Sequence, residues 1–430
     1  MTQSRVEDVW PLSPLQEGML FHATFDGETP DVYQAQRAME LTGPLDAGRL
    51  RATWEGLLAR HAALRAGFRQ RKSGESVQIV ARAVTLPWRE ADLSGLAEAD
   101  ALAELGRLSA RERAARFDMG VPPLLRLLLV RFGPERHRLV ITHHHILMDG
   151  WSLPVLIGEM TTVYAAGGST AGLPRTTSYR EYLAWLNRQD KEAARSAWRA
   201  SLAGVDGPTL VSPAAPERTT ESYANLSTHL SADLSQGLAR LAQRHDLTVN
   251  TVVQGAWALV LARLTGRDDV VFGATSAGRP AELPGVEAMV GLVIDTLPVR
   301  VRLDGGQPVI DMLTRLQERQ SALMAHQHLG LPEVQRTAGP GAVFDTLVVY
   351  ENYPRPPAEA PDPDAFAIEL ISGHEAAHYP LTLLLTPGAR MTCEIDYRPD
   401  LYERAAVESI VGRLVRVLEQ LAAEPAARVG

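Results

Sequence analysis

Residues 124–166, LLRLLLVRFGPERHRLVITHHHILMDGWSLPVLIGEMTTVYAA, decide the fold class of this chain. Two runs rich in apolar residues, 124–132 and 138–142, are separated by a Gly-Pro turn and predict two neighbouring strands. The periodicity then changes, because residues 153–166 repeat their apolar side chains at helical spacing and stop before two glycines. Both strands are so apolar that helices must bury the sheet. The stretch therefore predicts a mixed α/β fold.

Helical and extended patterns alternate over the rest of the chain as well. Residues 50–68 place several apolar side chains near helical spacing, among them Trp54, and predict a helix with one apolar stripe. Residues 249–264 are apolar on nearly every side and predict a central helix. Two further helices are predicted, one containing Tyr179 and Trp185 and one at 405–423.

The chain has 430 residues, which predicts two or more domains or one duplicated core at roughly 100–200 residues per domain. The Gly- and Thr-rich segment 167–177 is the best linker in the first half, and 204–221 and 354–363 are further loops. One pattern, W-x-x-(apolar)-L-A-R, occurs at 54–60 and again at 257–263. Chance and a duplicated α/β unit both explain this repeat.

The composition excludes several classes of protein. A formal net charge of −8 provides no global basic field for nucleic acid or an anionic membrane. The one cysteine, Cys393, excludes an intramolecular disulfide framework and any CxxC site. No apolar run approaches the ~18 residues of a membrane helix, and no signal-peptide core follows the first residues. We therefore expect a cytoplasmic protein without a membrane partner.

The densest group of chemically reactive residue types is Thr142-His-His-His-Ile-Leu-Met-Asp-Gly-Trp-Ser152. Side chains alternate along a strand, so His143 and His145 share one side and His144 faces the other. The three rings therefore cannot converge on one metal ion. A buried core histidine is the simpler interpretation, but the Asp-Gly pair that follows favours a functional turn. Asp149 can hold the turn through a cationic partner, and Gly150 allows a ligand carbonyl to approach backbone N–H groups.

The same residues resemble a known family signature. His144-His-Ile-Leu-Met-Asp-Gly150 is similar to the HHxxxDG motif of the condensation domains of nonribosomal peptide synthetases. Related acyltransferases of the chloramphenicol acetyltransferase type carry HxxxD forms, but the rest of the chain supports the more specific assignment. Motifs that match the family in order span about residues 10–400: PLSPLQEGMLFH (11–22), RHAALRAGF (60–68), YREYLAW (179–185), GRP (278–280), VGLVIDTLP (290–298) and ENYP (351–354). Two positions depart from the pattern, since Asp295 stands where the family commonly has Asn and the late His-Gln motif at 326–332 is loose.

The resemblance implies an α/β fold with two chloramphenicol-acetyltransferase-like lobes. The lobes would form a V-shaped pseudodimer with a tunnel between them. We expect residues 1–175 to form the N-terminal lobe, which carries HHxxxDG, and residues 176–430 to form the C-terminal lobe. The repeated W-x-x-(apolar)-L-A-R pattern would then be a relic of duplication.

The resemblance also implies a reaction and its residues. An acceptor amine on one peptidyl carrier protein would attack a donor acyl or peptidyl thioester on another, with both substrates held on 4′-phosphopantetheine arms. His145 would act as general base or positioning group, Gly150 would offer its N–H to the oxyanion, and His144 would pack into the loop. Asp149 would form a structural ion pair with Arg279. Further residues expected to line a substrate channel are Trp151, Ser276, Asp295 and Tyr350.

The same family implies partners and a context. We expect an excised, monomeric domain of a larger synthetase that contacts carrier proteins and a neighbouring adenylation domain. It would carry no cofactor or metal of its own. Rival functions are an epimerization domain, which acts on one carrier-bound residue, a free-standing acyltransferase that makes esters, and a non-catalytic docking module. The intact HHxxxDG argues against the docking module, and Trp151-Ser152 with ENYP favours condensation over epimerization.

Other motifs carry less weight. Residues 374–378 spell HExxH, but zinc proteases need this motif on a helix, and the flanks 365–371 and 381–385 are predicted strands. No zinc site is therefore expected. The chain contains no GxxxxGK[ST], GxSxG or GxGxxG motif, and only two lysines. Nothing in the sequence therefore indicates nucleotide hydrolysis, a serine nucleophile elbow or a dinucleotide cofactor.

Overall fold

The computed structural model describes residues 5–25, 31–212, 223–353, 366–374, 378–424 and 426–429. It divides into two compact units. Unit 1 comprises Met1–Arg188, Arg279–Val293 and Tyr353–Ala377, and unit 2 comprises Gln189–Gly278, Ile294–Asn352 and His378–Gly430. Neither unit is contiguous in sequence, in contrast with the ranges 1–175 and 176–430 expected above. Two later segments pack with the first 188 residues, which no local pattern in the sequence reveals.

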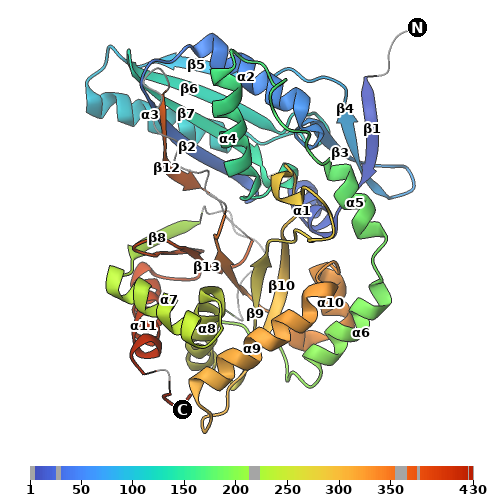
Figure 1. Cartoon of the computed structure of the whole chain (residues 1–430), viewed down its shortest axis with the longest axis vertical. Coiled ribbons are helices and arrows are strands. Elements are labelled where there is room, and N and C mark those ends of the chain that lie inside the picture. The colour runs from blue at the N-terminus through green and yellow to red at the C-terminus, as the bar shows by residue number, and fades with distance from the viewer. Residues whose placement is uncertain are drawn as a thin grey trace. The chain divides into compact units, whose positions relative to one another are not determined.

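The main sheet of unit 1 has five strands (Figure 1). Their spatial order is β12 (Ala367–His374), β2 (Gln34–Thr42), β7 (Arg136–His144), β6 (Leu125–Gly133) and β5 (Trp88–Asp92). The pairs β12–β2, β2–β7 and β7–β6 are antiparallel, whereas β5 runs parallel to β6. The β6–β7 hairpin confirms the two strands and the turn predicted from residues 124–142.

Helices cover both faces of this sheet. They are α2 (Ala47–Arg60), α3 (Glu98–Ala114) and α4 (Ser152–Ala165). Leu128 and Val130 of β6 pack against Leu105 of α3. Because side chains alternate along a strand, the buried Leu127 and Leu129 face the opposite side, which α2 and α4 cross (Figure 1). The sheet is therefore buried by helices, as the apolar density of its strands predicts.

The helix predicted for residues 50–68 ends earlier than expected. α2 begins at the N-cap Asp46, whose carboxylate accepts the N–H of Arg49, and His61 already adopts an extended backbone. A short 3-10 turn, Ala62–Arg65, follows and leads into strand β3 (Ala66–Gln70). The buried Arg65 explains the break, because its Nε donates to the carbonyl of Leu58 in the last turn of the helix. The apolar spacing of Leu64 fits a 3-10 turn as well as a helix.

A smaller sheet completes unit 1. Its strands are β1 (Val6–Pro11), β4 (Ser76–Ala81) and β3, all antiparallel, and it is accompanied by α1 (Pro14–Phe25) and α5 (Tyr179–Asn187). α5 is the helix predicted around Tyr179, and its buried rings pack against Val286 and Met289. The segment 167–177 is a loop as predicted, but it does not separate the units, because α5 also belongs to unit 1.

Unit 2 is built on a six-stranded sheet. The order is β10 (Asp295–Arg302), β9 (Asp269–Ser276), β11 (Thr346–Tyr350), β13 (Leu381–Thr386), β14 (Thr392–Tyr397) and β8 (Ala224–His229). β11 runs parallel to β9 and β13, and the remaining pairs are antiparallel. Its helices are α6 (Lys191–Leu202), α7 (Ala232–Arg244), α8 (Val249–Thr265), α9 (Val309–Leu323), α10 (Leu331–Ala338) and α11 (Arg404–Ala423).

The core of unit 2 forms around α8. Trp257, Ala256 and Leu261 of this helix are fully buried and pack with residues of α7, α9 and α11. α8 ends at Gly266, whose φ of 68° is the left-handed conformation that glycine supplies at a helix C-terminus. The helices predicted at 249–264 and 405–423 are thus confirmed. The loop predicted at 354–363 lies outside the described residues, as does the end of the loop at 204–221.

No single helix in the described part of the chain is both long and apolar enough to cross a membrane. By length and composition alone, α7 and α8 satisfy that test as a pair, with a bend of 107° between them.

Candidate active site

The histidine run lies where β7 ends in unit 1. His144 is the last residue of the strand and pairs with Gln34 of β2. His145 begins a short 3-10 turn, His145–Leu147, and its backbone N–H donates to the carbonyl of Tyr33. The chain then passes through Asp149 and Gly150 and enters α4 at Ser152. Both His144 and His145 are buried.

The hydrogen bond of the His145 ring determines its tautomer. Nδ1 lies 3.0 Å from the carbonyl oxygen of Met148, and a carbonyl oxygen can only accept a hydrogen bond. Nδ1 therefore carries the proton, and in the neutral ring Nε2 keeps its lone pair. The rings of His143 and His145 are 5.9 Å apart, which confirms that these two histidines share one side. The arrangement makes His145 Nε2 a proton acceptor.

His144 has the opposite tautomer. Its Nδ1 accepts the N–H of Ile146 at 3.1 Å, so the proton of the neutral ring belongs to Nε2. Nε2 lies 3.1 Å from Oδ2 of Asp31, and both side chains are almost fully buried. Burial alone would raise the pKa of Asp31, but the hydrogen bond from His144 and further contacts outweigh it, and the pKa is lowered. Asp31 thus stays ionised and orients the His144 ring.

The turn is also held by Gln16 from α1. Its Nε2 donates to the carbonyl of Ile146 at 3.0 Å, and its amide also bonds with the buried Gln78 of β4. Gln16 lies in the opening motif at 11–22, but its contact with a residue 130 positions away has no local signal. Asp31 was missed for the same reason. No sequence pattern around Asp31 indicates that its side chain pairs with a histidine.

Asp149 forms the ion pair expected with Arg279. Its carboxylate oxygens lie 3.0 and 3.2 Å from Arg279 Nη2, and neither side chain is more than 4% exposed. Oδ1 also accepts the N–H and the hydroxyl of Ser152, and Oδ2 accepts the N–H of Val293. The hydrogen bonds to the carboxylate compensate the burial of this charge. The sequence did not predict this role for Ser152.

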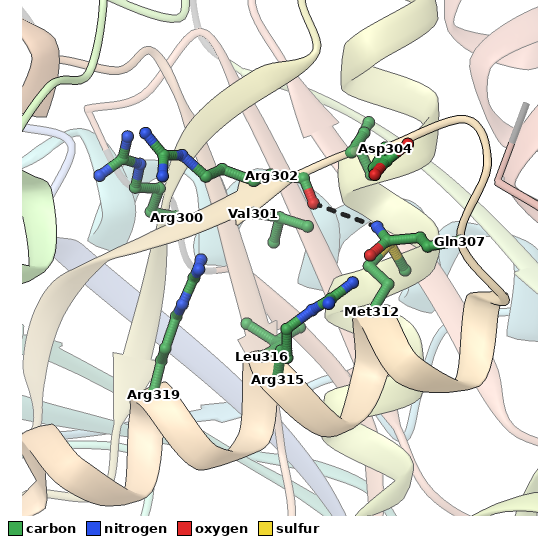
Figure 2. A pocket seen from close by; sticks show the side chains of 10 residues that line it. Arg300, Val301, Arg302, Asp304, Gln307, Met312, Arg315, Leu316 and Arg319 are labelled. Atoms are coloured by element: carbon green, nitrogen blue, oxygen red, sulfur yellow. Dashed lines mark hydrogen bonds between the residues drawn. The ribbon is translucent and has the colours of Figure 1, made fainter.

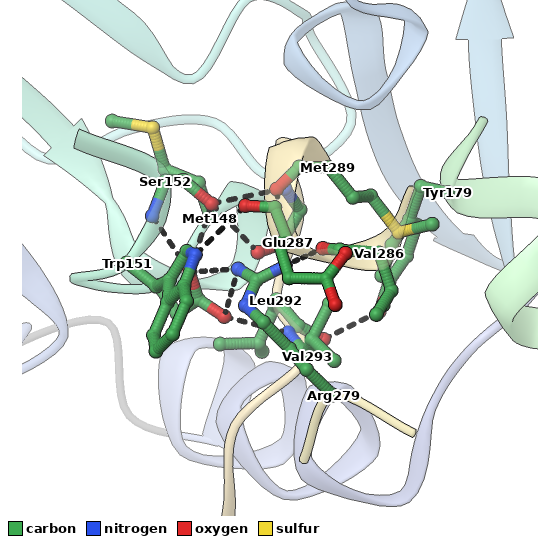
Figure 3. Close-up of polar contacts among 12 residues, drawn as sticks. Met148, Trp151, Ser152, Tyr179, Arg279, Val286, Glu287, Met289, Leu292 and Val293 are labelled. Atoms are coloured by element: carbon green, nitrogen blue, oxygen red, sulfur yellow. Dashed lines mark hydrogen bonds and ion pairs between the residues drawn. The ribbon is translucent and has the colours of Figure 1, made fainter. Parts of the chain in front are cut away.

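Arg279 connects the turn to the segment 279–293 (Figure 3). Its Nη1 donates to the carbonyls of Val286 and Met289 at 2.6 and 3.2 Å. Its guanidinium lies 5.1 Å from the ring of Trp151, and the indole N–H donates to the carbonyl of Glu287 at 2.8 Å. Trp151 is therefore fixed by a cation–π contact and a hydrogen bond. It was expected to line a substrate channel, and that role is untested.

At position 150 the side chain of Tyr353 occupies the space that a Cβ atom would need. A Cβ atom at this position would lie 2.4 Å from the hydroxyl oxygen of Tyr353, which belongs to the ENYP motif. The Tyr353 ring also makes an edge contact with Trp151. Tyr353 is thus brought against the turn that bears the histidines, within unit 1.

The other expected channel residues belong to unit 2. Ser276 and Asp295 face each other as partners of the β9–β10 ladder, and Tyr350 ends the neighbouring strand β11. The Ser276 hydroxyl donates to Oε1 of Gln327 at 2.6 Å, which brings the loose His-Gln motif to the same edge. Burial raises the pKa of Asp295 to about 7, although the N–H of Thr296 opposes the shift. Burial also raises the pKa of Tyr350.

Metal ligands were not expected from the sequence. Within the residues that the structure describes, no group of three His, Cys, Asp or Glu side chains could hold a metal ion. The HExxH motif is only partly covered, because 375–377 lie outside the described residues. Its flanks are the strands β12 and β13, as predicted.

Comparisons with known proteins agree with the sequence motifs. A family model described as "Condensation domain" matches residues 6–430. A component of the linear gramicidin synthase from Brevibacillus parabrevis is 35% identical over 436 residues. This match covers 99% of the chain but only 8% of the length of the synthase component.

Two solved structures share the fold. The first condensation domain of the calcium-dependent antibiotic synthetase superposes with a TM-score of 0.81 at 22% identity, and 99% of this chain and 98% of that one are covered. The X-domain from teicoplanin biosynthesis superposes with a TM-score of 0.82 at 23% identity, and the match covers 100% of this chain and 98% of the X-domain chain. The likeness confirms the mixed α/β, chloramphenicol-acetyltransferase-like fold. By its family match and its relatives, this chain belongs to the condensation-domain family of the nonribosomal peptide synthetases.

Proposed function

We propose that this chain forms an amide bond between two substrates held on carrier proteins. The nitrogen of a carrier-bound aminoacyl group attacks the carbonyl carbon of a donor thioester. The carbon–sulfur bond breaks, the thiol of the donor arm leaves, and the acceptor amine loses one proton. The hydrogen bond from His145 Nδ1 to the carbonyl of Met148 carries this proposal, because it makes Nε2 the unprotonated ring nitrogen, and only an unprotonated nitrogen can accept that proton.

The chemistry demands little activation from the protein. An α-amino group has a pKa of about 7.7–8.0, so part of it is neutral near pH 7, and a thioester is already an activated acyl group. The remaining tasks are to align the two tethered reactants and to handle one proton and one developing negative charge. We assign the proton to His145, as general base or as the group that positions the amine. We assign the oxyanion to the backbone N–H of Gly150.

The other residues of the turn support these two. Asp31 orients the ring of His144, whose Nδ1 in turn accepts from the backbone next to His145. The pair of Asp149 and Arg279 is a structural element, because hydrogen bonds within unit 1 surround the carboxylate. Ser276, Asp295 and Tyr350 are proposed to line the substrate channel, together with Trp151.

The partners follow from the relatives. This chain corresponds to 8% of the gramicidin synthase component, so we propose that it acts beside other domains of a larger synthetase. The donor and the acceptor arrive on the 4′-phosphopantetheine arms of carrier proteins, and an adenylation domain adjoins. As an excised domain it is expected to be a monomer, to act in the cytoplasm and to need no cofactor of its own.

A non-catalytic docking module is the second candidate. The X-domain from teicoplanin biosynthesis has the same fold, and a related structure is described as its complex with OxyB. The present chain keeps both histidines, Asp149 and Gly150, and the tautomer of His145 suits proton acceptance. These features favour catalysis. Epimerization and ester formation remain the enzymatic rivals.

One assay separates these functions. The chain is mixed with two carrier proteins, one loaded with a donor acyl group and the other with an aminoacyl group, and the acceptor arm is followed by mass spectrometry. Condensation adds the mass of the donor to the acceptor through an amide bond that resists hydroxylamine. Epimerization changes no mass, an ester product is cleaved by hydroxylamine, and a docking module gives no product. Any of the last three results would refute the proposal.

A further inference from the structure

Unit 2 contains a pocket lined by arginines, away from every residue discussed above. It lies between the end of β10 and the helix α9 and has a volume of about 230 Å³ (Figure 2). Val301, Met312 and Leu316 provide its apolar wall, and four guanidinium groups reach it from the strand and the helix: Arg300, Arg302, Arg315 and Arg319.

The guanidinium of Arg300 is already hydrogen-bonded to other groups of the protein. Its Nε and Nη2 bond with the carboxylate of Asp269 at 2.6–3.2 Å. Its Nη1 donates to the carbonyls of Ser201 and Ala203. Arg300 is buried and uses most of its N–H donors in these bonds, so it is part of the framework of the pocket and contributes mainly its charge.

The other three arginines are available to a ligand. Arg302 is 57% exposed and makes one long contact, 3.4 Å, with Asp269. Arg315 and Arg319 stand one turn apart on α9, and neither makes a hydrogen bond or an ion pair with the described part of the chain. Figure 2 shows both side chains rising from the helix toward the strand that carries Arg302.

Positive charge in this pocket exceeds the negative charge. Asp269 and Asp304 are the carboxylates that accompany the four arginines, and Asp269 is taken up by Arg300 and Arg302. Burial lowers the pKa of Arg319, and the charges of Arg300, Arg302 and Arg315 lower it further. The guanidinium groups therefore repel one another in the absence of an anion. A cationic pocket of this kind is unusual in a chain whose net charge is −8.

The size of the pocket restricts the ligand. A volume of 230 Å³ equals that of roughly eight water molecules, and it is below the ~300–1,000 Å³ of pockets that enclose drug-sized molecules. Guanidinium groups bind phosphate oxygens through paired, charge-assisted hydrogen bonds. We propose that Arg302, Arg315 and Arg319 form a binding site for a phosphate-type anion, either a free phosphate or diphosphate or the terminal phosphate of a larger molecule.

The proposal is tested by isothermal titration calorimetry on the whole chain. The probes are sodium phosphate, sodium pyrophosphate and glycerol 2-phosphate, each against sodium chloride at equal ionic strength. We expect saturable binding of at least one phosphate probe and none of chloride. Tight binding of glycerol 2-phosphate would identify a phosphate ester as the source, whereas binding of the inorganic anions alone would identify a free anion.

Two variants with matched charge locate the site. Arg315→Ala/Arg319→Ala should weaken binding at least about tenfold, because charge-assisted hydrogen bonds to the anion are lost. Arg240→Ala/Arg244→Ala removes an exposed pair with the same spacing on α7 of the same unit and should bind as the wild type does. Arg302→Ala, on the strand, should weaken binding of the anion independently of the two α9 residues. Unchanged melting temperatures verify that all variants are folded.

Two results would overturn the proposal. The first is the absence of saturable binding of every phosphate probe at millimolar concentration. The second is equal weakening in the α9 and α7 double variants, which would indicate a diffuse response to net charge. Neither result bears on amide formation, because the pocket shares no residue with the turn that carries His145.

Discussion

The two units share one topology but differ in the turn that follows the second strand of the central hairpin. In unit 1 the order β2-β7-β6-β5 has two antiparallel pairs and then a parallel one. In unit 2 the order β8-β14-β13-β11 has the same sequence of orientations. β7 leads through the histidine turn into α4, and β14 leads through a short turn into α11. The two units thus differ in the sequence of this turn, and the proposed chemistry depends on the turn of unit 1.

The residues at the equivalent positions are of different kinds. His144 ends β7, and Tyr397 ends β14, so that His145 corresponds to Arg398. Arg398 pairs with Asp400 only two residues away, whereas Asp149 pairs with Arg279 across 130 positions. Unit 2 thus has a local ion pair where unit 1 has a proton acceptor held by distant segments. We expect a duplicated unit in which only one copy kept the histidine turn to explain this difference.

The sequence repeat adds no support to this explanation. Trp54 of α2 and Trp257 of α8 carry the shared W-x-x-(apolar)-L-A-R pattern, and one lies in each unit. Both side chains are fully buried, and neither indole N–H has a hydrogen-bond partner within the described residues. Strand β2 leads into α2, whereas its counterpart β8 leads into α7, so α2 and α8 are not equivalent helices and the repeat does not distinguish duplication from chance.

Replacing the reactive residue should produce the largest effect. His145→Ala removes the proton acceptor and should slow amide formation on the order of 10²–10⁴-fold, as expected for a lost acid–base group. Arg398→Ala, at the equivalent position of unit 2, should leave the rate per folded molecule within about twofold. The loaded-carrier assay gives both rates. Comparable losses in the two variants would contradict the division of roles between the units.

The two ion pairs should differ in their contribution to stability. Asp149→Ala leaves Arg279 buried without its carboxylate and should cost about 3–5 kcal/mol of unfolding free energy. Asp400→Ala also strands a buried arginine, Arg398, but its carboxylate is 25% exposed, so water already solvates the pair and the loss should be smaller, about 1–3 kcal/mol. Urea denaturation measures both losses. If Asp149→Ala kept its full stability while losing activity, the pair would be catalytic and not structural.

The buried carboxylates predict opposite responses to pH. The pKa of Asp31 in unit 1 is lowered, whereas burial raises that of Asp295 in unit 2 to about 7. The folded protein then binds a proton at Asp295 more tightly than the unfolded chain does. Its contribution to stability is present at pH 4 and is lost as pH rises toward 7.

Asp295→Asn tests this sign, because the amide does not titrate. We expect the variant to be more stable than the wild type at pH 8, on the order of 1–3 kcal/mol, and the difference to vanish near pH 4. Asp31→Asn should show the opposite trend, with a loss that is largest at pH 8. Thermal unfolding between pH 2 and 8 measures both, because the contribution of Asp31 is lost only as the pH falls below its unfolded pKa of about 4. A difference for Asp295→Asn that does not depend on pH would show that Asp295 is ionised in the folded state.

Much of the fold could be predicted from local patterns. The hairpin at 124–142, the helix at 249–264 and the closing helix all follow from apolar spacing that a few neighbouring residues determine. Apolar spacing did not predict that α2 ends at Arg60. The position of Leu64 suits an α-helix and a 3-10 turn equally, and the contact that we assign to the break is the hydrogen bond from the Arg65 side chain to the carbonyl of Leu58. The pairing of β12 with β2 joins residues more than 300 positions apart, and no local pattern specifies it.

The residues of the candidate site likewise fall into those that the sequence predicted and those that it did not. The HHxxxDG turn and the partner of Asp149 were predicted, because a motif and a family resemblance point to them. Asp31, Gln16 and Ser152 were not predicted in their roles, because each acts through a hydrogen bond that only the folded chain creates. Residues that orient others carry no signature of their own in a single sequence.

The tautomer of His145 is the central claim, and NMR of the ¹⁵N-histidine-labelled chain tests it most directly. Long-range proton–nitrogen correlations near pH 7.5, assigned with His145→Gln, distinguish the two ring nitrogens. We predict a proton on Nδ1 and an unprotonated Nε2, in accordance with the hydrogen bond to Met148. A proton on Nε2 of the neutral ring would contradict the account, because that nitrogen could then not accept a proton from an amine.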